Sequence, residues 1–170
     1  MKEAVVVIID ANESMATKVA VPADKRKLEN EEGRSRFDCA KEASIAILCD
    51  LMVRSKANEA TVIVLHSETT NNYFYDQDDY KSGSENDDDV EVHCPFPGIT
   101  ELSGNGHVMG IRQPLPDLLR AIQKLKPTSA EAKRDKRKRG PNAMGGDFES
   151  GLVYAADALH RRTAGKKFDR

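Results

Sequence analysis

The sequence predicts an α/β domain with a central, mostly parallel sheet and flanking helices. Unbroken β-branched and aliphatic runs at residues 3–10 and 60–66 are typical of strands covered on both faces, as in the middle of a parallel sheet. Between them, apolar residues recur at helical spacing over residues 35–54. A strand, a helix and a second buried strand form a βαβ unit, which we expect to have a right-handed crossover.

The first of these strands organises the chain, because an oxygen-rich turn follows it. Residues 10–14 read DANES and place a carboxylate, an amide and a hydroxyl at Asp10, Asn12 and Ser14. Ligands of open α/β sheets bind at the carboxyl ends of central strands, and oxygen ligands suit a divalent cation. The alternative is that Asp10 and Ser14 only satisfy amides of the loop and of the next helix start.

The helix predicted over residues 35–54 has a recognisable start. Ser35 is expected to cap it, and Asp38 places a negative charge in its first turn. The face expected to pack on the sheet contains Phe37, Ala40, Ser44, Ile47, Leu48 and Leu51. The strand that follows ends at His66, for which a structural role is commoner than a catalytic one.

Polar segments dominate the middle of the chain. Residues 76–91 are strongly acidic but lack the EF-hand pattern, so we expect a solvated loop. Apolar and polar residues alternate over residues 90–94, which predicts a short edge strand. Residues 98–114 are rich in glycine without the lysine of a phosphate-binding loop, and are predicted to be a flexible connection.

Two further helices are predicted in the second half. Pro116 begins one, with Leu118, Leu119, Ile122 and Leu125 as its apolar face. The other runs from an Asp147 cap to residue 162, with Phe148, Leu152, Ala155, Ala156 and Leu159 as its apolar face.

A basic segment at residues 127–143 separates these helices. Its charged core can contact DNA phosphates or act as a nuclear localisation signal. The alternative is a solvated linker attracted to the acidic loop. The residues expected to contact nucleic acid are Lys133, Arg134, Lys136, Arg137, Lys138 and Arg139.

Composition limits the class of protein. The chain has 170 residues, 39% of them hydrophobic, which suits one globular domain. Its net charge of -2 says little about binding partners, because acidic and basic residues are segregated along the chain. Three cysteines without metal spacing predict free thiols in a reducing compartment. No signal peptide or membrane-spanning run is expected, so the sequence indicates a cytosolic or nuclear protein. Two strong strands and one weak strand are few for three helices, which predicts a domain truncated before its later strands.

Residues 10–14 and 145–152 (GGDFESGL) resemble the two halves of a von Willebrand factor A domain. In that family, a metal-ion-dependent adhesion site uses DxSxS after the first strand, a Thr before a later helix, and an Asp after the following strand. Asp10 and Ser14 match this pattern, whereas Asn12 replaces Ser and Asp147 replaces Thr. The resemblance implies a Rossmann-like A domain over residues 1–170, C-terminally incomplete, and a degraded Mg²⁺ site at Asp10, Ser14 and Asp147.

A narrower resemblance points to the large subunit of the eukaryotic Ku heterodimer, in a form similar to the fungal one. It rests on residues 4–10 (AVVVIID) with Met15, on the Asp-Phe pair at 147–148, on residues 90–93, and above all on residues 163–170 (TAGKKFDR). Ku threads onto double-stranded DNA ends, starts non-homologous end joining and acts at telomeres. In this family the A domain is peripheral, mainly binds other proteins, and the DNA-encircling ring comes from a later β-barrel.

The resemblance therefore implies a non-catalytic role in double-strand break repair, a nuclear location, and no membrane. Its implied partners are the Ku small subunit, DNA ends reached through the complex, and other end-joining proteins. Ku is often described as an ATP-dependent DNA helicase, but the sequence has no Walker A motif that would support nucleotide hydrolysis. The alternatives are a Mg²⁺-dependent ligand-binding A domain of another family and a subunit of an ATP-dependent DNA helicase.

Overall fold

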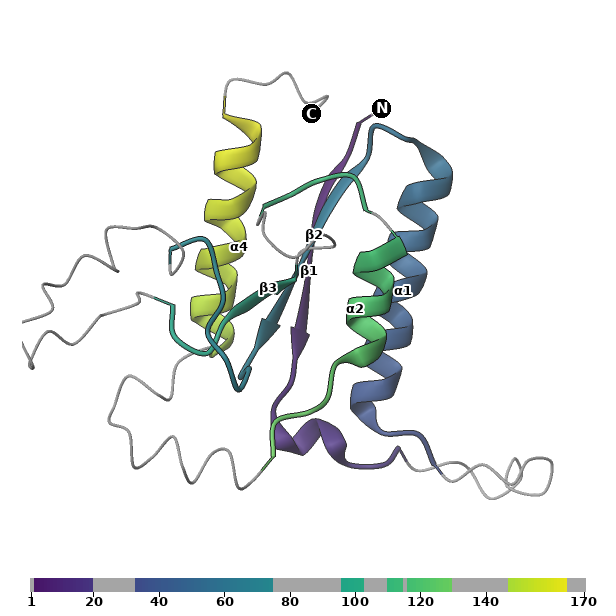
Figure 1. Ribbon diagram of the computed structural model, residues 1–170, viewed down its shortest axis with the longest axis vertical. Helices are drawn as coiled ribbons and strands as arrows, with labels where there is room; N and C mark the ends of the chain where they lie inside the picture. The colour runs from purple at the N-terminus through teal and green to yellow at the C-terminus, as the bar shows by residue number, and fades with distance from the viewer. Residues whose placement is uncertain are drawn as a thin grey trace, which may run out of the picture.

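The computed structural model describes residues 2–19, 33–74, 96–102, 110–114, 116–129 and 147–164. In this part of the chain a sheet of three strands lies between helices, with α4 on one face and α1 and α2 on the other (Figure 1). The strands are β1 (Ala4–Asp10), β2 (Glu59–Leu65) and β3 (Thr100–Leu102), and the order in the sheet is β1-β2-β3. The predicted α/β class is confirmed.

β1 and β2 pair in parallel, from Ala4 opposite Glu59 to Asp10 opposite Leu65. The βαβ unit predicted for the first half of the chain is thus present, with α1 (Arg36–Arg54) between the two strands. β3 pairs with β2 in the antiparallel direction. All residues of β2 are buried, whereas β1 is mostly half-buried. Within the described sheet β2 is therefore the central strand.

The helix starts are largely those that the sequence predicted. The Ser35 side chain caps α1 by accepting the Asp38 backbone N–H at 3.0 Å. α2 (Pro116–Lys124) begins at the predicted proline, and Asp147 caps α4 (Phe148–Thr163). A short 3-10 helix, Glu13–Ala16, follows the turn after β1.

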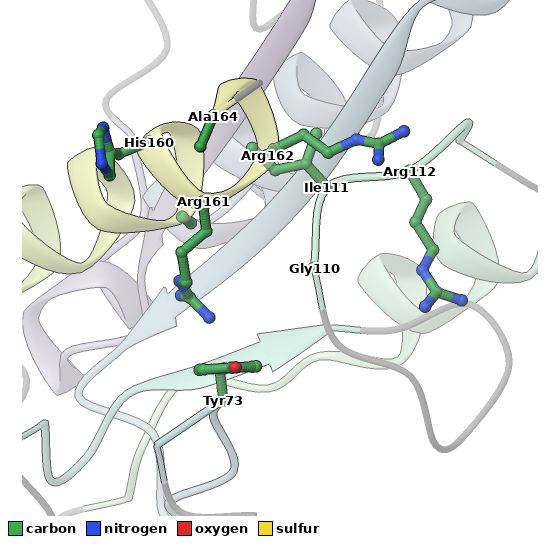
Figure 2. A pocket seen from close by; sticks show the side chains of 9 residues that line it. Tyr73, Gly110, Ile111, Arg112, His160, Arg161, Arg162 and Ala164 are labelled. Carbon is green, nitrogen blue, oxygen red and sulfur yellow. The ribbon is translucent and has the colours of Figure 1, made fainter. Parts of the chain in front are cut away.

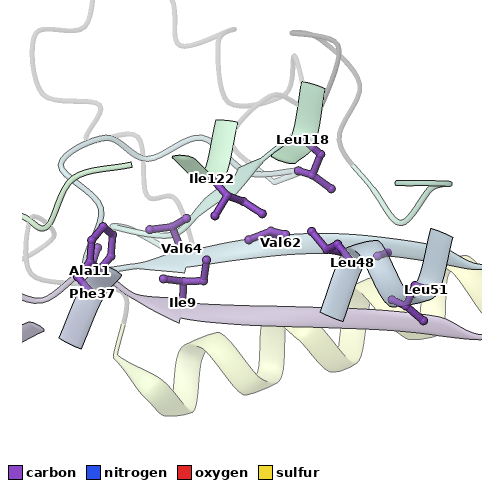
Figure 3. Packing of buried hydrophobic residues seen from close by; sticks show 10 residues of the cluster. Ile9, Ala11, Phe37, Leu48, Leu51, Val62, Val64, Leu118 and Ile122 are labelled. Carbon is purple, nitrogen blue, oxygen red and sulfur yellow. The ribbon is translucent and has the colours of Figure 1, made fainter. Parts of the chain in front are cut away.

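A hydrophobic core fills the space between the sheet and the α1–α2 layer (Figure 3). Aliphatic side chains from both strands meet the buried faces of both helices here. Its buried members are Ile9, Ala11, Phe37, Leu48, Leu51, Ala60, Val62, Val64, Leu118 and Ile122. A second, smaller cluster under α4 contains Ile63, Leu65, Ile99, Tyr154 and Ala155.

Two predicted helix faces need correction. On α1, Ile47 is exposed although its spacing suggested burial. On α4 only Ala155 of the predicted stripe is buried, and the other buried residues are Gly151, Tyr154 and Ala158. Close approach explains the difference, because a Cβ at Gly151 would lie 2.6 Å from Leu65 Cδ2. Small residues let α4 pack tightly on β2, which counting large apolar side chains does not detect.

The glycine-rich segment at 98–114 is also more ordered than predicted. It contains β3, and Arg112 exchanges backbone hydrogen bonds with Ala60 at 2.6 and 3.1 Å. A flexible connection was therefore the wrong prediction for these parts. The edge strand predicted at 90–94 and the acidic loop at 76–91 lie outside the described residues.

A buried polar network ties α4 to β3. Glu101 is only 2% exposed, and its carboxyl group accepts hydrogen bonds from the Tyr154 hydroxyl (2.6 Å), the Thr61 hydroxyl (2.8 Å) and the Gly110 amide (2.8 Å). The Tyr154 hydroxyl in turn accepts the Tyr73 amide at 3.0 Å. Burial, reinforced by the neighbouring Glu101 carboxyl, raises the pKa of Tyr154. Each of these buried polar groups is thereby hydrogen-bonded inside an otherwise apolar cluster.

We expect Tyr154→Phe to lower the free energy of unfolding by about 1–3 kcal/mol, because it leaves buried polar partners unsatisfied. Tyr73→Phe is the matched control. The Tyr73 ring is partly exposed, and removal of its hydroxyl is expected to change stability by less than about 0.5 kcal/mol. Urea unfolding of both variants checks this, and equal stabilities for the two would contradict the network's contribution.

Candidate functional site

The turn after β1, which the sequence singled out, lies beside the carboxyl end of β2. Because Asp10 lies opposite Leu65, the next residue, His66, reaches the Asp10 side chain. Asp10 Oδ1 lies 2.8 Å from His66 Nδ1 and also accepts the Asn12 backbone N–H at 2.8 Å. The carboxylate of Asp10 thus closes its own turn and orients the histidine ring.

His66 has an unusual backbone conformation. Its φ of 54° lies in the left-handed region, where residues other than glycine are uncommon. Its carbonyl accepts the hydroxyl of Thr128, and the Thr128 amide donates to the Ala11 carbonyl at 2.7 Å. Thr128, 4% exposed, therefore links the ends of both strands to the segment after α2. Sequence reasoning missed this residue, since it lies in the segment predicted to be a basic linker and carries no local signal.

Asp147 lies at the start of α4. Its Oδ1 accepts the Ser150 backbone N–H at 2.7 Å, as a helix N-cap does. This hydrogen bond is the main reason why the pKa of Asp147 is below its usual value, with a smaller contribution from the charge of His66. Asp147 and His66 thus interact electrostatically, although the two come from different elements.

The three side chains predicted for the Mg²⁺ site make other contacts or lie apart in the structure. The Asp10 carboxylate is engaged by His66 and Asn12, the Asp147 carboxylate caps α4, and Ser14 is exposed on the short helix after the turn. In the described ranges no group of three or more His, Cys, Asp or Glu side chains is placed to hold a metal ion. Both contacts of Asp10 use Oδ1, so a divalent cation at that oxygen would compete with His66. The Mg²⁺ site at Asp10, Ser14 and Asp147 remains a prediction.

A second candidate region is a cavity of about 740 Å³ between α4, Tyr73 and the segment 110–112 (Figure 2). The Arg161 guanidinium projects toward the Tyr73 ring and lies 3.9 Å from its centroid. Arg162 is bound in a two-pronged ion pair by Glu59, which also contacts Lys2 at 3.1 Å. The sequence predicted none of these residues as a site, because they come from segments far apart in the chain.

The described lining of this cavity is rich in cationic side chains. The described residues that line it include arginines, which do not act as bases near neutral pH, and no carboxylate or thiol. The Glu59 carboxylate holds Arg162, and its pKa is lowered chiefly by that hydrogen-bonded pair. His160 also lines the cavity.

The other predicted site residues are not placed. Lys133, Arg134, Lys136, Arg137, Lys138 and Arg139 lie outside the described residues. Cys39 and Cys49 are both free thiols on α1, as expected, while Cys94 lies outside the described part. None of the described helices combines the length and the apolar character needed to cross a lipid bilayer.

The lowered pKa of Asp147 predicts a pH dependence of stability. Ionised Asp147 stabilises the folded chain above its ordinary pKa of 3.8, and this contribution is lost as the pH falls through the lowered value. Asp147→Asn keeps an N-cap acceptor without the charge, whereas Asp147→Ala keeps neither.

At neutral pH we therefore expect the melting temperature to be highest for the wild type and lowest for Asp147→Ala. The difference between the wild type and Asp147→Asn should vanish as the pH falls below the lowered pKa of Asp147. Thermal unfolding followed by circular dichroism measures it, and a difference that does not change with pH would contradict the assignment.

Comparison of the sequence with known protein families finds no family that matches, and comparison with curated proteins finds no matching relative. The function of the chain is therefore inferred from its residues and from their arrangement.

Proposed function

We propose that this chain is a non-catalytic interaction domain of a Ku-type DNA-end-binding complex. In this proposal it acts in the nucleus, in double-strand break repair by non-homologous end joining and in telomere maintenance. Its partners are the Ku small subunit and other end-joining proteins. The proposal draws on the Ku-like runs at residues 4–10 and 163–170 and is compatible with the α/β arrangement of the described residues.

The observation that carries the non-catalytic part is the Asp10–His66 pair. At the edge where open α/β sheets bind their ligands, the first carboxylate is already hydrogen-bonded to a histidine and to its own turn. An imidazole that is held in this way occupies a coordination position of the carboxylate. The edge is therefore suited to keeping the two strand ends together, and less suited to Mg²⁺-dependent adhesion.

Contact of this chain with DNA is only a secondary part of the proposal. The family's DNA-encircling element is a separate β-barrel, so this chain alone should have no preference for DNA ends. Any affinity it has should come from the basic core at residues 133–139 and depend on salt, because phosphate contacts release counterions.

The first test is fluorescence anisotropy of a labelled blunt duplex, with closed circular DNA as competitor. For the chain alone we expect weak binding that circles compete away. Replacing the six basic residues with Ser should reduce the slope of log affinity against log salt by about 0.9 for each phosphate that is no longer neutralised. A matched variant with Lys124 and Lys126 changed to Ser controls for general removal of positive charge.

Two results would contradict the proposal. End-specific binding by the chain alone would mean that it carries a DNA-binding function of its own. Failure to bind the Ku small subunit in a pull-down with both purified proteins would argue against the Ku assignment.

A Mg²⁺-dependent ligand-binding A domain is distinguished by thermal shift. We expect millimolar Mg²⁺ to leave the melting temperature of the wild type unchanged, because His66 already engages Asp10. A rise in melting temperature that Asp10→Ala abolishes, and that Asp50→Ala on the exposed side of α1 does not, would favour the Mg²⁺-dependent alternative.

A further inference from the structure

The cavity beside the carboxyl end of α4 lies apart from the strand ends that hold Asp10 and His66. Asp147 caps the other end of this helix, and Arg161 lies in its last turn. At about 1.5 Å per residue, about 21 Å of helix separates Asp147 from Arg161. The cavity is therefore a separate region, and the proposed function does not use it.

Two walls of this cavity are fixed by one buried carboxyl group. Tyr73 and Gly110 both line the cavity (Figure 2). The Tyr73 amide donates to the Tyr154 hydroxyl at 3.0 Å, and that hydroxyl donates to Glu101 Oε2 at 2.6 Å. The Gly110 amide donates to Glu101 Oε1 at 2.8 Å. Because these bonds exist without a ligand, the walls are already ordered, which lowers the cost of binding.

The Arg161 side chain is also held in place. Its guanidinium carbon lies 3.9 Å from the centroid of the Tyr73 ring, and its Nε lies 2.7 Å from Asp157 Oδ2. Stacking uses the face of a guanidinium, so the donors on its terminal nitrogens stay in the plane of the group. A fork of this kind matches two oxygens of a phosphate or of a carboxylate.

Arg112 brings a second guanidinium from a different part of the chain. Its backbone is fixed by hydrogen bonds to Ala60 at 2.6 and 3.1 Å, while the residue as a whole is exposed. Figure 2 shows the Arg112 and Arg161 side chains projecting in the same direction, one from segment 110–112 and the other from α4. Basic residues at the end of a helix often only complement the helix dipole. Arg112 lies outside the described helices, so the dipole does not explain its place at this cavity.

The charges at the cavity do not balance. Arg162, the third arginine of the lining, is paired with Glu59, which also contacts Lys2. Without counting His160, the three arginines and the lysine face only two carboxylates, those of Glu59 and Asp157. These described groups therefore carry an excess of two positive charges. A phosphate monoester carries about two negative charges near neutral pH.

Part of the lining is apolar. Ile111, Ala158, Ala164 and the Tyr73 ring line the same cavity as the arginines. Its volume of about 740 Å³ is within the range of about 300–1,000 Å³ that is typical of small-molecule sites, and is larger than a bare anion needs. A ligand that fills this cavity therefore has an organic group beside its anion.

We propose that this cavity binds a phosphate monoester, with Arg161 and Arg112 as the residues that bind the phosphate and with the organic group against Ile111 and the alanines. The phosphate belongs either to a free small molecule or to a phosphorylated side chain of another protein, because both present the same dianion. This inference does not depend on the proposed Ku function, since it concerns only the described residues around the cavity.

The test is isothermal titration calorimetry of the full chain with phenyl phosphate. We expect saturable binding to one site, at least about 10-fold tighter than that of phenyl sulfate, which has a similar shape and a single negative charge. Inorganic phosphate should also bind at least about 10-fold more weakly than phenyl phosphate, because it leaves the apolar part of the lining uncovered.

A short peptide with one phosphoserine, compared with its unphosphorylated form, separates the two sources of the phosphate. A phosphopeptide that binds at least as tightly as phenyl phosphate supports a protein ligand. One that binds more weakly, while phenyl phosphate binds as expected, supports a small phosphorylated molecule.

Arg112→Gln tests the assignment with little risk to the fold, because the residue is exposed and its contacts to Ala60 use only the backbone. It should weaken the binding of phenyl phosphate at least about 10-fold, since charge-assisted hydrogen bonds are lost. Arg161→Lys keeps the charge without the planar fork and should weaken it about fivefold. Arg120→Gln is the matched control, because Arg120 is exposed on α2 and pairs with Asp117. It should change the affinity less than about twofold.

Three results would overturn the proposal. The first is the absence of saturable heat at millimolar phenyl phosphate, and the second is equal binding by Arg112→Gln and Arg120→Gln. The third uses a dinucleotide with hydroxyl ends, which has only a phosphodiester. If it binds as tightly as phenyl phosphate, the cavity recognises a nucleic-acid backbone instead. Far-ultraviolet circular dichroism confirms that each variant folds.

Discussion

The parallel pairing of β1 with β2 positions the other parts of the molecule. Its register places Asp10 beside Leu65, and thereby brings the next residue, His66, onto the Asp10 carboxylate. The same pairing forms the floor on which α1 and α2 pack from one side and α4 from the other. A shift of one residue would move the apolar side chains of β1 to the opposite face and separate the aspartate from the histidine at once. The candidate site and the core therefore depend on one alignment.

The two faces of the sheet are stabilised in different ways. The α1–α2 side is an aliphatic core, in which stability comes from burial and close packing. The α4 side combines a smaller apolar cluster with the carboxyl group of Glu101 and aromatic rings from three segments, including Phe74 packed 5.3 Å from Phe96. Buried polar groups of this kind require defined geometry from each partner. The α4 side therefore specifies where the helix lies, while the other side supplies most of the apolar burial.

Sequence reasoning succeeded where the signal is local. The β-branched run of β1, the Ser35 and Asp147 caps and the Pro116 start all depend on neighbouring residues, and each was confirmed. It failed where the cause lies elsewhere in the chain. The buried face of α4 is set by the close approach of Gly151 to Leu65. β3 is a strand because its backbone pairs with that of β2. At the site, Asp10 was predicted from its turn, but Thr128 belongs there only because two strand ends converge on it.

The Thr128 contacts also have a consequence for the order in which the chain assembles. Thr128 bonds to Ala11 and His66, residues that leave the ribosome long before it. β1, α1 and β2 have by then been synthesised. Until α4 arrives, the face formed by Val6, Ile8, Ile63 and Leu65 has no cover from that helix. Such nascent apolar faces attract chaperones and promote aggregation, so a pause in translation between residues 65 and 148 would expose this chain at its most vulnerable stage.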